Sequence, residues 1–243
     1  MEIAKRAKLE IWLVLALSLG QSAIYSILSF VIAYTSPKGI GGSTTSINGN
    51  LAPIEWQDFS FQFLQYAFQF APVALAIYLA GSIRNIGLNL QKLPKQLVHG
   101  LALAASIGIP GLGLYWLART LGLSAQVITA PDSPYWWTPL MLLMAAATAA
   151  VLEETIMVGF IFRKLNEVGR SANFALWLSA IIRASYHLYQ GLGGFVGNLV
   201  MGLVFGKMFQ NTGRLLPLIF AHFLLDTAAF LGYPLAKAVF PWL

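Results

Sequence analysis

Apolar segments of the length of a membrane-spanning helix recur along this chain of 243 residues. An α-helix needs about 20 consecutive apolar residues to cross the hydrocarbon core of a bilayer. Seven segments come close to that length, at about residues 11–34, 59–81, 97–117, 138–162, 172–190, 192–210 and 215–233. The pattern predicts an all-α fold, a polytopic transmembrane helical bundle with seven to eight membrane helices. The eighth would be a partial or interfacial helix over residues 235–243.

The composition agrees with a membrane protein and excludes several other classes. Hydrophobic residues make up 58% of the chain and charged residues only 10%, whereas soluble domains carry about 25% charged residues. We predict a single membrane domain over residues 1–243. The net charge of +6 does not indicate nucleic-acid binding, because the basic residues flank the apolar segments. The chain has no cysteine, which excludes disulfides, a thiolate nucleophile and a Cys-ligated zinc site.

Basic residues are distributed unequally between the two ends of these segments. If the N-terminus is cytoplasmic, the cytoplasmic side holds most of them, namely Lys5, Arg6, Lys8, Arg84, Lys92, Lys95, Arg163, Lys164, Arg170, Lys207 and Arg214. The opposite side keeps Lys38, Arg119 and Lys237, and Arg183 falls inside the membrane. By the positive-inside rule, this asymmetry predicts a multi-pass protein with a cytoplasmic N-terminus. We expect the membrane to be a bacterial plasma membrane.

Two longer connections separate the apolar segments. Residues 35–58 contain Pro37, several glycines and a Ser/Thr run, which indicate a polar loop. Residues 118–137 contain Pro131 and Pro134, and we predict a second loop there. That loop ends in the aromatic group 135–137, which is typical of an anchor at a membrane interface.

Two adjacent glutamates, Glu153 and Glu154, interrupt the fourth apolar segment. A carboxylate at the centre of a bilayer costs roughly 2.5–3.5 kcal/mol on insertion scales, so such residues are functional or are neutralised by partners. Later apolar segments offer His187, His222 and Asp226 as partners. A rise of 1.5 Å per residue places all five groups at overlapping depths in the membrane. We therefore expect them to meet in one buried pocket.

The five residues suit the activation of a water molecule. Adjacent residues of an α-helix point about 100° apart, so one glutamate can face the pocket while the other takes a structural partner. A carboxylate can act as general base with a histidine that orients the water, and a second histidine can donate to the developing oxyanion. His222 and Asp226 are four residues apart and share a helix face. Two histidines and a carboxylate also match a catalytic zinc site, although the HExxH motif is absent.

Two interpretations without hydrolysis remain open. The polar residues could simply join neighbouring helices in a membrane scaffold, since such groups stabilise helix contacts in lipid. They could also form the proton relay of a transporter, but the chain shows neither inverted repeats nor paired broken helices. Because the polar groups occur together on three separate segments, we favour a site over a scaffold.

Three motifs, in this order, resemble the CPBP intramembrane protease family. They are Glu153-Glu154 with the four residues that follow, Ser185-Tyr186-His187, and His222-Phe-Leu-Leu-Asp226. The family includes type II CAAX prenyl endopeptidases and bacteriocin-immunity (Abi-like) proteins. Its pattern is Glu-Glu-x-x-x-Arg, then Phe-x-x-x-His, then His-x-x-x-Asn or His-x-x-x-Asp. The matching region covers about residues 138–233.

The resemblance implies a role for each residue. Glu153 would activate the water together with His187, and Glu154 would support them. His222 and Asp226 would stabilise the oxyanion or help to bind a metal. The resemblance leaves metal dependence open: a zinc ion would take His187, His222 and Glu153 as ligands, and a metal-independent enzyme would use none. The implied partners are a membrane-associated peptide or protein of prenylated CAAX type and the lipid bilayer, and no nucleic acid.

The chain departs from the family pattern at two positions. Val158 replaces the arginine of the first motif, and Arg183 replaces the phenylalanine of the second. An arginine inside a membrane needs a carboxylate partner. We predict that Arg183 supplies from the fifth segment the cation that family members carry in the fourth, and that it pairs with Glu154. The departures also leave room for a catalytically weakened member.

From the motifs, we predict an intramembrane endopeptidase. A water activated by glutamate and histidine would cleave a peptide bond of a membrane-associated substrate without a covalent intermediate. The alternative is a non-catalytic membrane scaffold or a bacteriocin-immunity-type protein.

Overall fold

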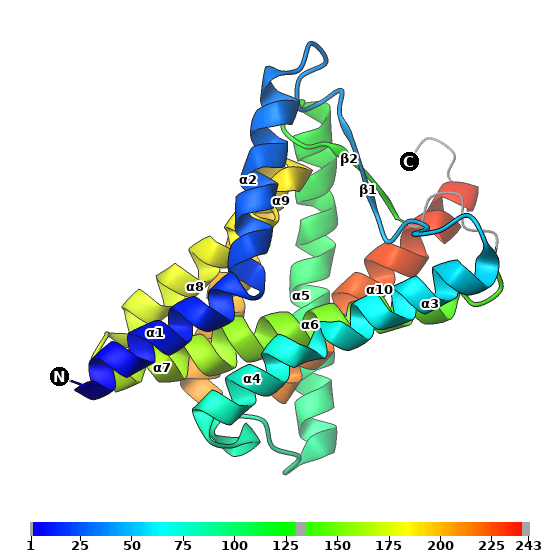
Figure 1. The fold of residues 1–243 in the computed structure, drawn as a ribbon. Helices are drawn as coiled ribbons and strands as arrows, with labels where there is room; N and C mark the ends of the chain where they lie inside the picture. The colour runs from blue at the N-terminus through cyan, green and yellow to red at the C-terminus, as the bar shows by residue number, and fades with distance from the viewer. Residues whose placement is uncertain (1, 130–134, 240–243) are drawn as a thin grey trace.

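Helices account for nearly all of the regular structure, which confirms the predicted all-α bundle (Figure 1). The computed structural model describes residues 2–129 and 135–239. The α-helices are α1 (Glu2–Ala16), α2 (Leu19–Thr35), α3 (Glu55–Phe68), α4 (Phe70–Ala80), α5 (Leu93–Thr120), α6 (Thr138–Glu153), α7 (Ile161–Glu167), α8 (Ala172–Tyr186), α9 (Leu192–Thr212) and α10 (Leu216–Val239). Two short 3₁₀ turns, η1 (Ile83–Ile86) and η3 (Leu188–Gln190), and the π-helical segment η2 (Glu154–Phe160) complete the helical part.

Only some of the seven to eight predicted membrane helices are long and apolar enough, in the described structure, to cross a membrane. Within the described residues, 4 stretches qualify: Glu55–Ala80, Leu93–Thr120, Thr138–Glu167 and Leu192–Thr212. Helices α1 and α2, bent by 52° at their junction, make a fifth if they are counted as one span. Helix α8 has 15 residues, and the apolar stretch Leu216–Gly232 of α10 is also shorter than a span. The count of seven to eight membrane helices stays a prediction.

The continuous helical stretch formed by α6, η2 and α7 lies at the centre of the molecule (Figure 1). Its most apolar part is 67% buried, whereas the other 3 long stretches are only 17–28% buried. Helices α1, α3, α4, α8 and α10 pack around it, and every residue of η2 is buried. The glutamate pair therefore lies in the protein core rather than against lipid.

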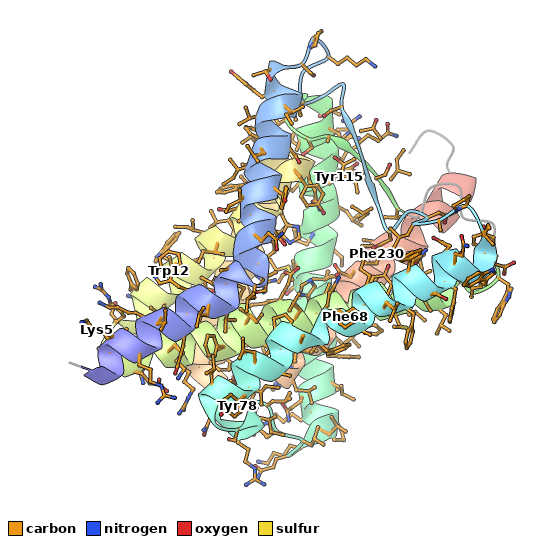
Figure 2. All side chains as sticks on the ribbon, viewed as in Figure 1. Lys5, Trp12, Phe68, Tyr78, Tyr115 and Phe230 are labelled. Carbon is orange, nitrogen blue, oxygen red and sulfur yellow. The ribbon has the colours of Figure 1, made fainter. Side chains whose placement is uncertain are left out.

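The outer surface is covered by large apolar side chains. Trp12, Phe68 and Tyr78, labelled in Figure 2, are 71%, 70% and 81% exposed. A water-soluble monomer rarely exposes extended apolar surface, whereas a bilayer accepts it. The long apolar helices and this surface are those of an integral membrane protein.

The prediction that both long connections are loops is wrong in part. Strands β1 (Thr44–Ile47) and β2 (Gln126–Thr129) pair in parallel, with Thr44 opposite Gln126. Both strands contain β-branched residues, which favour extended backbone, and the pairing satisfies backbone groups of both connections. Pro131 and Pro134 lie outside the described residues.

Two further predictions are wrong in part, one for the C-terminal residues 235–243 and one for the aromatic group 135–137. The separate helix predicted over 235–243 is wrong as far as residue 239, because α10 continues to Val239; residues 240–243 lie outside the described part. Within the aromatic group, Trp136 is 83% exposed, but Trp137 is buried at 3% and donates from Nε1 to Glu55 Oε1 at 3.2 Å. The prediction of an interfacial anchor is therefore wrong for Trp137, which packs in the core.

Candidate active site

The two glutamates lie at a change of helix type. Glu153 is the last residue of α6, and Glu154 is the first residue of the π-helical segment η2. A π-helical turn contains an extra residue and frequently occurs at functional sites. The two carboxylates share Arg183 but otherwise have different partners, so the predicted division of roles between them stays a prediction.

Glu153 forms one half of the cluster with residues from the end of α8. Its Oε2 accepts a hydrogen bond from Tyr186 Oη at 2.7 Å. Arg183 Nη1 lies 3.5 Å from the same oxygen, and His187 Nε2 lies 3.8 Å from it. Glu153 is 8% exposed, so a phenol, a guanidinium and an imidazole converge on one largely buried carboxylate oxygen.

Glu154 forms the other half and is fully buried. Its Oε1 accepts a hydrogen bond from Arg183 Nη2 at 2.6 Å and lies 2.7 Å from His222 Nδ1. The predicted ion pair between Arg183 and Glu154 is confirmed. Arg183 thus contacts both glutamates, and its guanidinium also lies over the ring of Phe205, 5.7 Å from the centroid.

Space for the buried Arg183 comes from a close approach of α8 and α9 at Gly202. A Cβ atom at this position would lie 2.9 Å from Ala180 Cα and 3.3 Å from Arg183 Cδ. Only glycine allows α9 to approach so closely. Val158, at the position of the missing motif arginine, is buried at 1% and belongs to the apolar core. The local charge is therefore supplied from α8, as the sequence predicts.

His222 and Asp226 extend the cluster along α10. His222 is 4% exposed, and its Nε2 lies 3.4 Å from Asp226 Oδ2. Since its Nδ1 faces Glu154, the imidazole lies between two carboxylates. The structure therefore brings all five predicted residues together, from α6, η2, the end of α8 and α10.

His187 terminates α8 and is the least constrained member of the cluster. Its backbone leaves the helical conformation, with φ −103° and ψ 2°. Its ring lies against the rings of Tyr186 and Tyr189, at centroid distances of 4.9 and 6.3 Å. Neither ring nitrogen hydrogen-bonds to any described residue. Both nitrogens are thus buried and unpaired, with Nε2 3.8 Å from Glu153, and catalytic contacts that are long without substrate commonly shorten when it binds.

The predicted zinc ligands do not form a metal site in the described part of the chain. No group of at least 3 His, Asp or Glu side chains there is arranged to hold a metal ion. His222 turns its two nitrogens toward Glu154 and Asp226, whereas His187 lies beside Glu153. The ligand set of His187, His222 and Glu153 does not fit a zinc ion in this arrangement.

Tyr186 is the functional residue that sequence reasoning missed. It precedes His187 directly and is 5% exposed. A buried tyrosine in an apolar helix usually has a hydrogen-bond partner for its hydroxyl group. Because Tyr186 also precedes the motif residue His187, the sequence could have placed this hydroxyl near the site. Its contact with Glu153 makes it a positioning residue for that carboxylate.

We expect Tyr186→Phe to lower kcat about tenfold with little change in KM, and to lower the unfolding temperature by a few degrees. The substitution removes one hydrogen bond to an ionised carboxylate, worth about 1.5–3 kcal/mol, while keeping the ring that packs on His187. Steady-state cleavage kinetics and thermal unfolding in detergent measure both quantities. Tyr115→Phe, which removes the hydroxyl that accepts from the Val127 amide, is the matched control. Equal losses in the two variants would contradict the positioning role.

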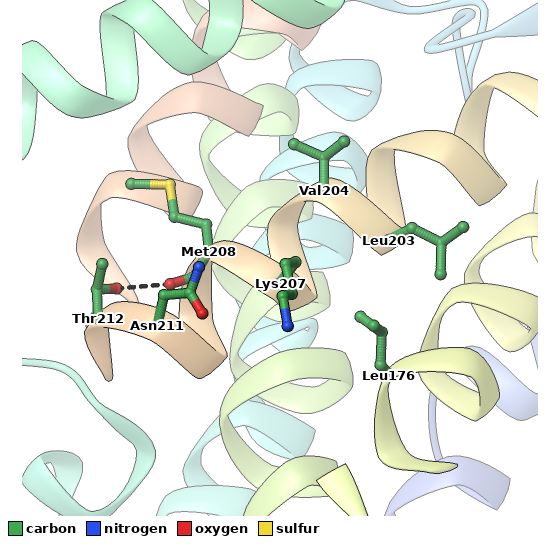
Figure 3. A pocket seen from close by; sticks show the side chains of 7 residues that line it. All are labelled: Leu176, Leu203, Val204, Lys207, Met208, Asn211 and Thr212. Carbon is green, nitrogen blue, oxygen red and sulfur yellow. Dashed lines mark hydrogen bonds between the residues drawn. The ribbon is translucent and has the colours of Figure 1, made fainter. Parts of the chain in front are cut away.

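A cavity beside α8 and α9 lies away from this cluster. It measures about 580 Å³ and is lined by Leu176 of α8 and by residues of α9 between Leu203 and Thr212 (Figure 3). Lys207 is the one charged residue in its wall. None of the cluster residues contributes to this wall, so the cavity is not part of the candidate active site.

Comparison with known proteins agrees with the motifs. The family model "Type II CAAX prenyl endopeptidase Rce1-like" matches residues 135–228, a region that contains all five cluster residues and Arg183. No curated protein and no solved structure matches the chain. The matched family is a protease family, so the match supports a CAAX-type intramembrane endopeptidase at the level of the family. The resemblance inferred from the three motifs is confirmed for this part of the chain, because residues 135–228 match the Rce1-like family model.

Proposed function

We propose that the cluster is the active site of an intramembrane endopeptidase that hydrolyses peptide bonds of membrane-associated substrates. The observation that carries the proposal is the unequal environment of the two glutamates. Glu154 is held by close contacts with Arg183 and His222, whereas Glu153 accepts from Tyr186, lies farther from Arg183 at 3.5 Å and faces the imidazole of His187 at 3.8 Å. One carboxylate is thus held in place, and the other is placed to accept a proton.

In the proposed reaction, Glu153 takes a proton from a water molecule that His187 orients, and the water oxygen attacks the carbonyl carbon of the scissile bond. The carbonyl π electrons move to its oxygen, and His222 Nε2–H, which lies at the longer distance of 3.4 Å from Asp226, turns from that carboxylate to donate to the resulting oxyanion, while Nδ1 stays on Glu154. When the tetrahedral intermediate collapses, the C–N bond breaks and Glu153 returns its proton to the leaving amine. No covalent intermediate with the protein forms.

We propose a prenylated CAAX-type peptide as the substrate class and the lipid bilayer as the second partner. The name of the matched family supports the first, and the apolar outer surface supports the second. The excess of basic residues on one side supports a cytoplasmic N-terminus, in keeping with a bacterial plasma membrane.

The proposal is tested by offering the purified protein, in liposomes, a panel of prenylated and lipid-anchored peptides and identifying products by mass spectrometry. We expect cleavage by the wild type and a loss of about 100-fold or more in His187→Gln. His99→Gln, which alters the one histidine of the chain outside the motifs, should cleave normally. We expect a chelator to leave cleavage unchanged, because the described residues do not form a three-ligand site. Loss of cleavage with chelator and its recovery with zinc would overturn that expectation.

A further inference from the structure

A stripe of polar side chains runs along one face of the otherwise apolar helix α2. The stripe consists of Gln21, Ser22, Tyr25, Ser26 and Ser29, whose spacing places them on neighbouring turns of the same face. All five line a cavity of about 460 Å³. We call this cavity the α2 groove.

Helix packing does not explain most of the stripe. Ser26 is buried and its Oγ accepts a hydrogen bond from the Tyr189 amide at 2.7 Å, which ties α2 to η3. In contrast, Gln21, Ser22 and Ser29 are exposed, and their side chains make no hydrogen bond with any described residue. Polar groups in a membrane segment usually face protein partners or a water-filled or substrate pathway. The unpaired groups therefore indicate that something polar occupies the groove.

The inner wall of the α2 groove leads to the candidate active site. Tyr186 and Tyr189 form part of that wall. The hydroxyl of Tyr186 donates to Glu153, and the rings of both tyrosines lie against the ring of His187 between them in sequence. A molecule in the groove would thus lie against the residues that flank the water-activating pair.

The chemistry of the lining points to the backbone of a peptide. It offers hydroxyl and amide groups, which both donate and accept hydrogen bonds, and it contains no charged side chain. It therefore does not suit a charged lipid head group. An extended peptide inside a membrane must satisfy every N–H and C=O group, and neutral donors and acceptors along a groove can do this. Thr45 of the extended strand β1 completes the wall.

We propose that the α2 groove binds the extended, uncharged backbone of a membrane-anchored substrate next to its scissile bond, and that the substrate reaches Glu153 sideways past α2. This inference rests on the proposed peptidase function. It assigns to α2, which lies outside residues 135–228 of the family match, the recognition of the substrate backbone.

Cysteine labelling tests the inference, because the chain contains no cysteine of its own. Ser22→Cys and Ser29→Cys place a thiol in the groove, and Leu28→Cys places one on an exposed residue of α2 outside it. Each variant also carries Glu153→Gln, so that the probe is not consumed. The probe is a farnesylated CAAX peptide without charged side chains. Its cysteine sulfur carries the farnesyl group as a thioether and therefore does not react with maleimide. Wild-type protein is assayed for cleavage of the same peptide.

We expect the peptide to slow maleimide labelling of both groove thiols about tenfold at tenfold excess over Kd, and to leave Leu28→Cys unaffected. Cleavage by the wild type without protection of the groove thiols would contradict substrate binding in the α2 groove but would still support the peptidase function. Protection without cleavage would support the groove and count against the peptidase function. Absence of both, or equal protection of all three thiols, would overturn the groove as a specific site.

Discussion

Glu153→Gln should reduce peptide cleavage by about 100- to 10,000-fold, the range that a positioned general base contributes. Glutamine has nearly the size of glutamate but cannot accept the proton of the attacking water. Its amide oxygen can still accept from Tyr186, and Arg183 keeps its 2.6 Å contact with Glu154. We therefore expect the variant to fold and to unfold at nearly the wild-type temperature.

The matched control for this variant is Glu167→Gln, in α7 of the same continuous helical stretch. Glu167 pairs with Arg163 and Lys164, and it has no contact with the active-site cluster. The Glu167→Gln variant should cleave at the wild-type rate. The two variants and the wild type are compared by initial cleavage rates in liposomes and by thermal unfolding in detergent.

A scaffold or immunity-type protein makes the opposite prediction. In that case the cluster only specifies how the helices pack, and Glu153→Gln should keep full function wherever the protein folds. A folded wild type that cleaves no peptide of the panel would favour this alternative. A folded Glu153→Gln protein that cleaves as well as the wild type would show that another group accepts the proton.

The active-site cluster could be predicted because each member is costly in an apolar segment. Glu153, Glu154, His187, His222 and Asp226 stand out in segments where polar residues are rare, and helix rise alone places them at similar depths. The pairing of Arg183 with Glu154 followed from the same reasoning, since a buried cation needs a carboxylate. These predictions depend on energetic cost and not on the details of packing.

Other features depend on tertiary contacts that no local pattern reveals. The π-helical start at Glu154 has no sequence signature, and it separates the partners of the two glutamates. The parallel pairing of Thr44–Ile47 with Gln126–Thr129 joins segments far apart in the chain. Helix α8 ends at Tyr186, although the apolar pattern continues to residue 190, because the backbone turns at His187. The position of Tyr186 beside His187 places it near the site, but its specific contact with Glu153 depends on this turn.

Removing one partner of the buried ion pair should destabilise the protein more than any other single change considered above. Arg183 and Glu154 are both fully buried, and their contact is 2.6 Å. Taking one charge away leaves the other with only its second partner, which is Glu153 for Arg183 and His222 for Glu154, and removing one member of a buried pair costs about 3–5 kcal/mol. We expect Arg183→Met and Glu154→Gln each to lower the free energy of unfolding by about this amount. Methionine is chosen because it fills the space beside Phe205 and avoids the added cost of a cavity.

The double variant Arg183→Met with Glu154→Gln should be little less stable than either single variant. Neither buried charge then lacks its counter-charge, and His222 keeps a hydrogen-bonding partner in the glutamine amide. The expected coupling energy is about 3 kcal/mol or more, close to the cost of one single variant, measured by chemical unfolding in detergent micelles. Additive losses would instead mean that Arg183 and Glu154 stabilise the protein through other neighbours, namely Glu153 for Arg183 and His222 for Glu154.

The partly exposed pair Arg163 and Glu167 provides the control cycle, because it has the same chemistry in a less buried environment. Its Nε and Oε1 atoms lie 3.1 Å apart, but the side chains are 35% and 28% exposed. Water and ions screen such a pair, so Arg163→Met and Glu167→Gln should couple by only about 0.3–0.5 kcal/mol. A large difference between the coupling energies of the two cycles would show that burial, and not the pairing of opposite charges alone, makes the ion pair of Arg183 and Glu154 strong. It would also explain why a chain whose first motif has lost its arginine carries another at position 183, since the buried Glu154 requires a cation from whichever helix can supply it.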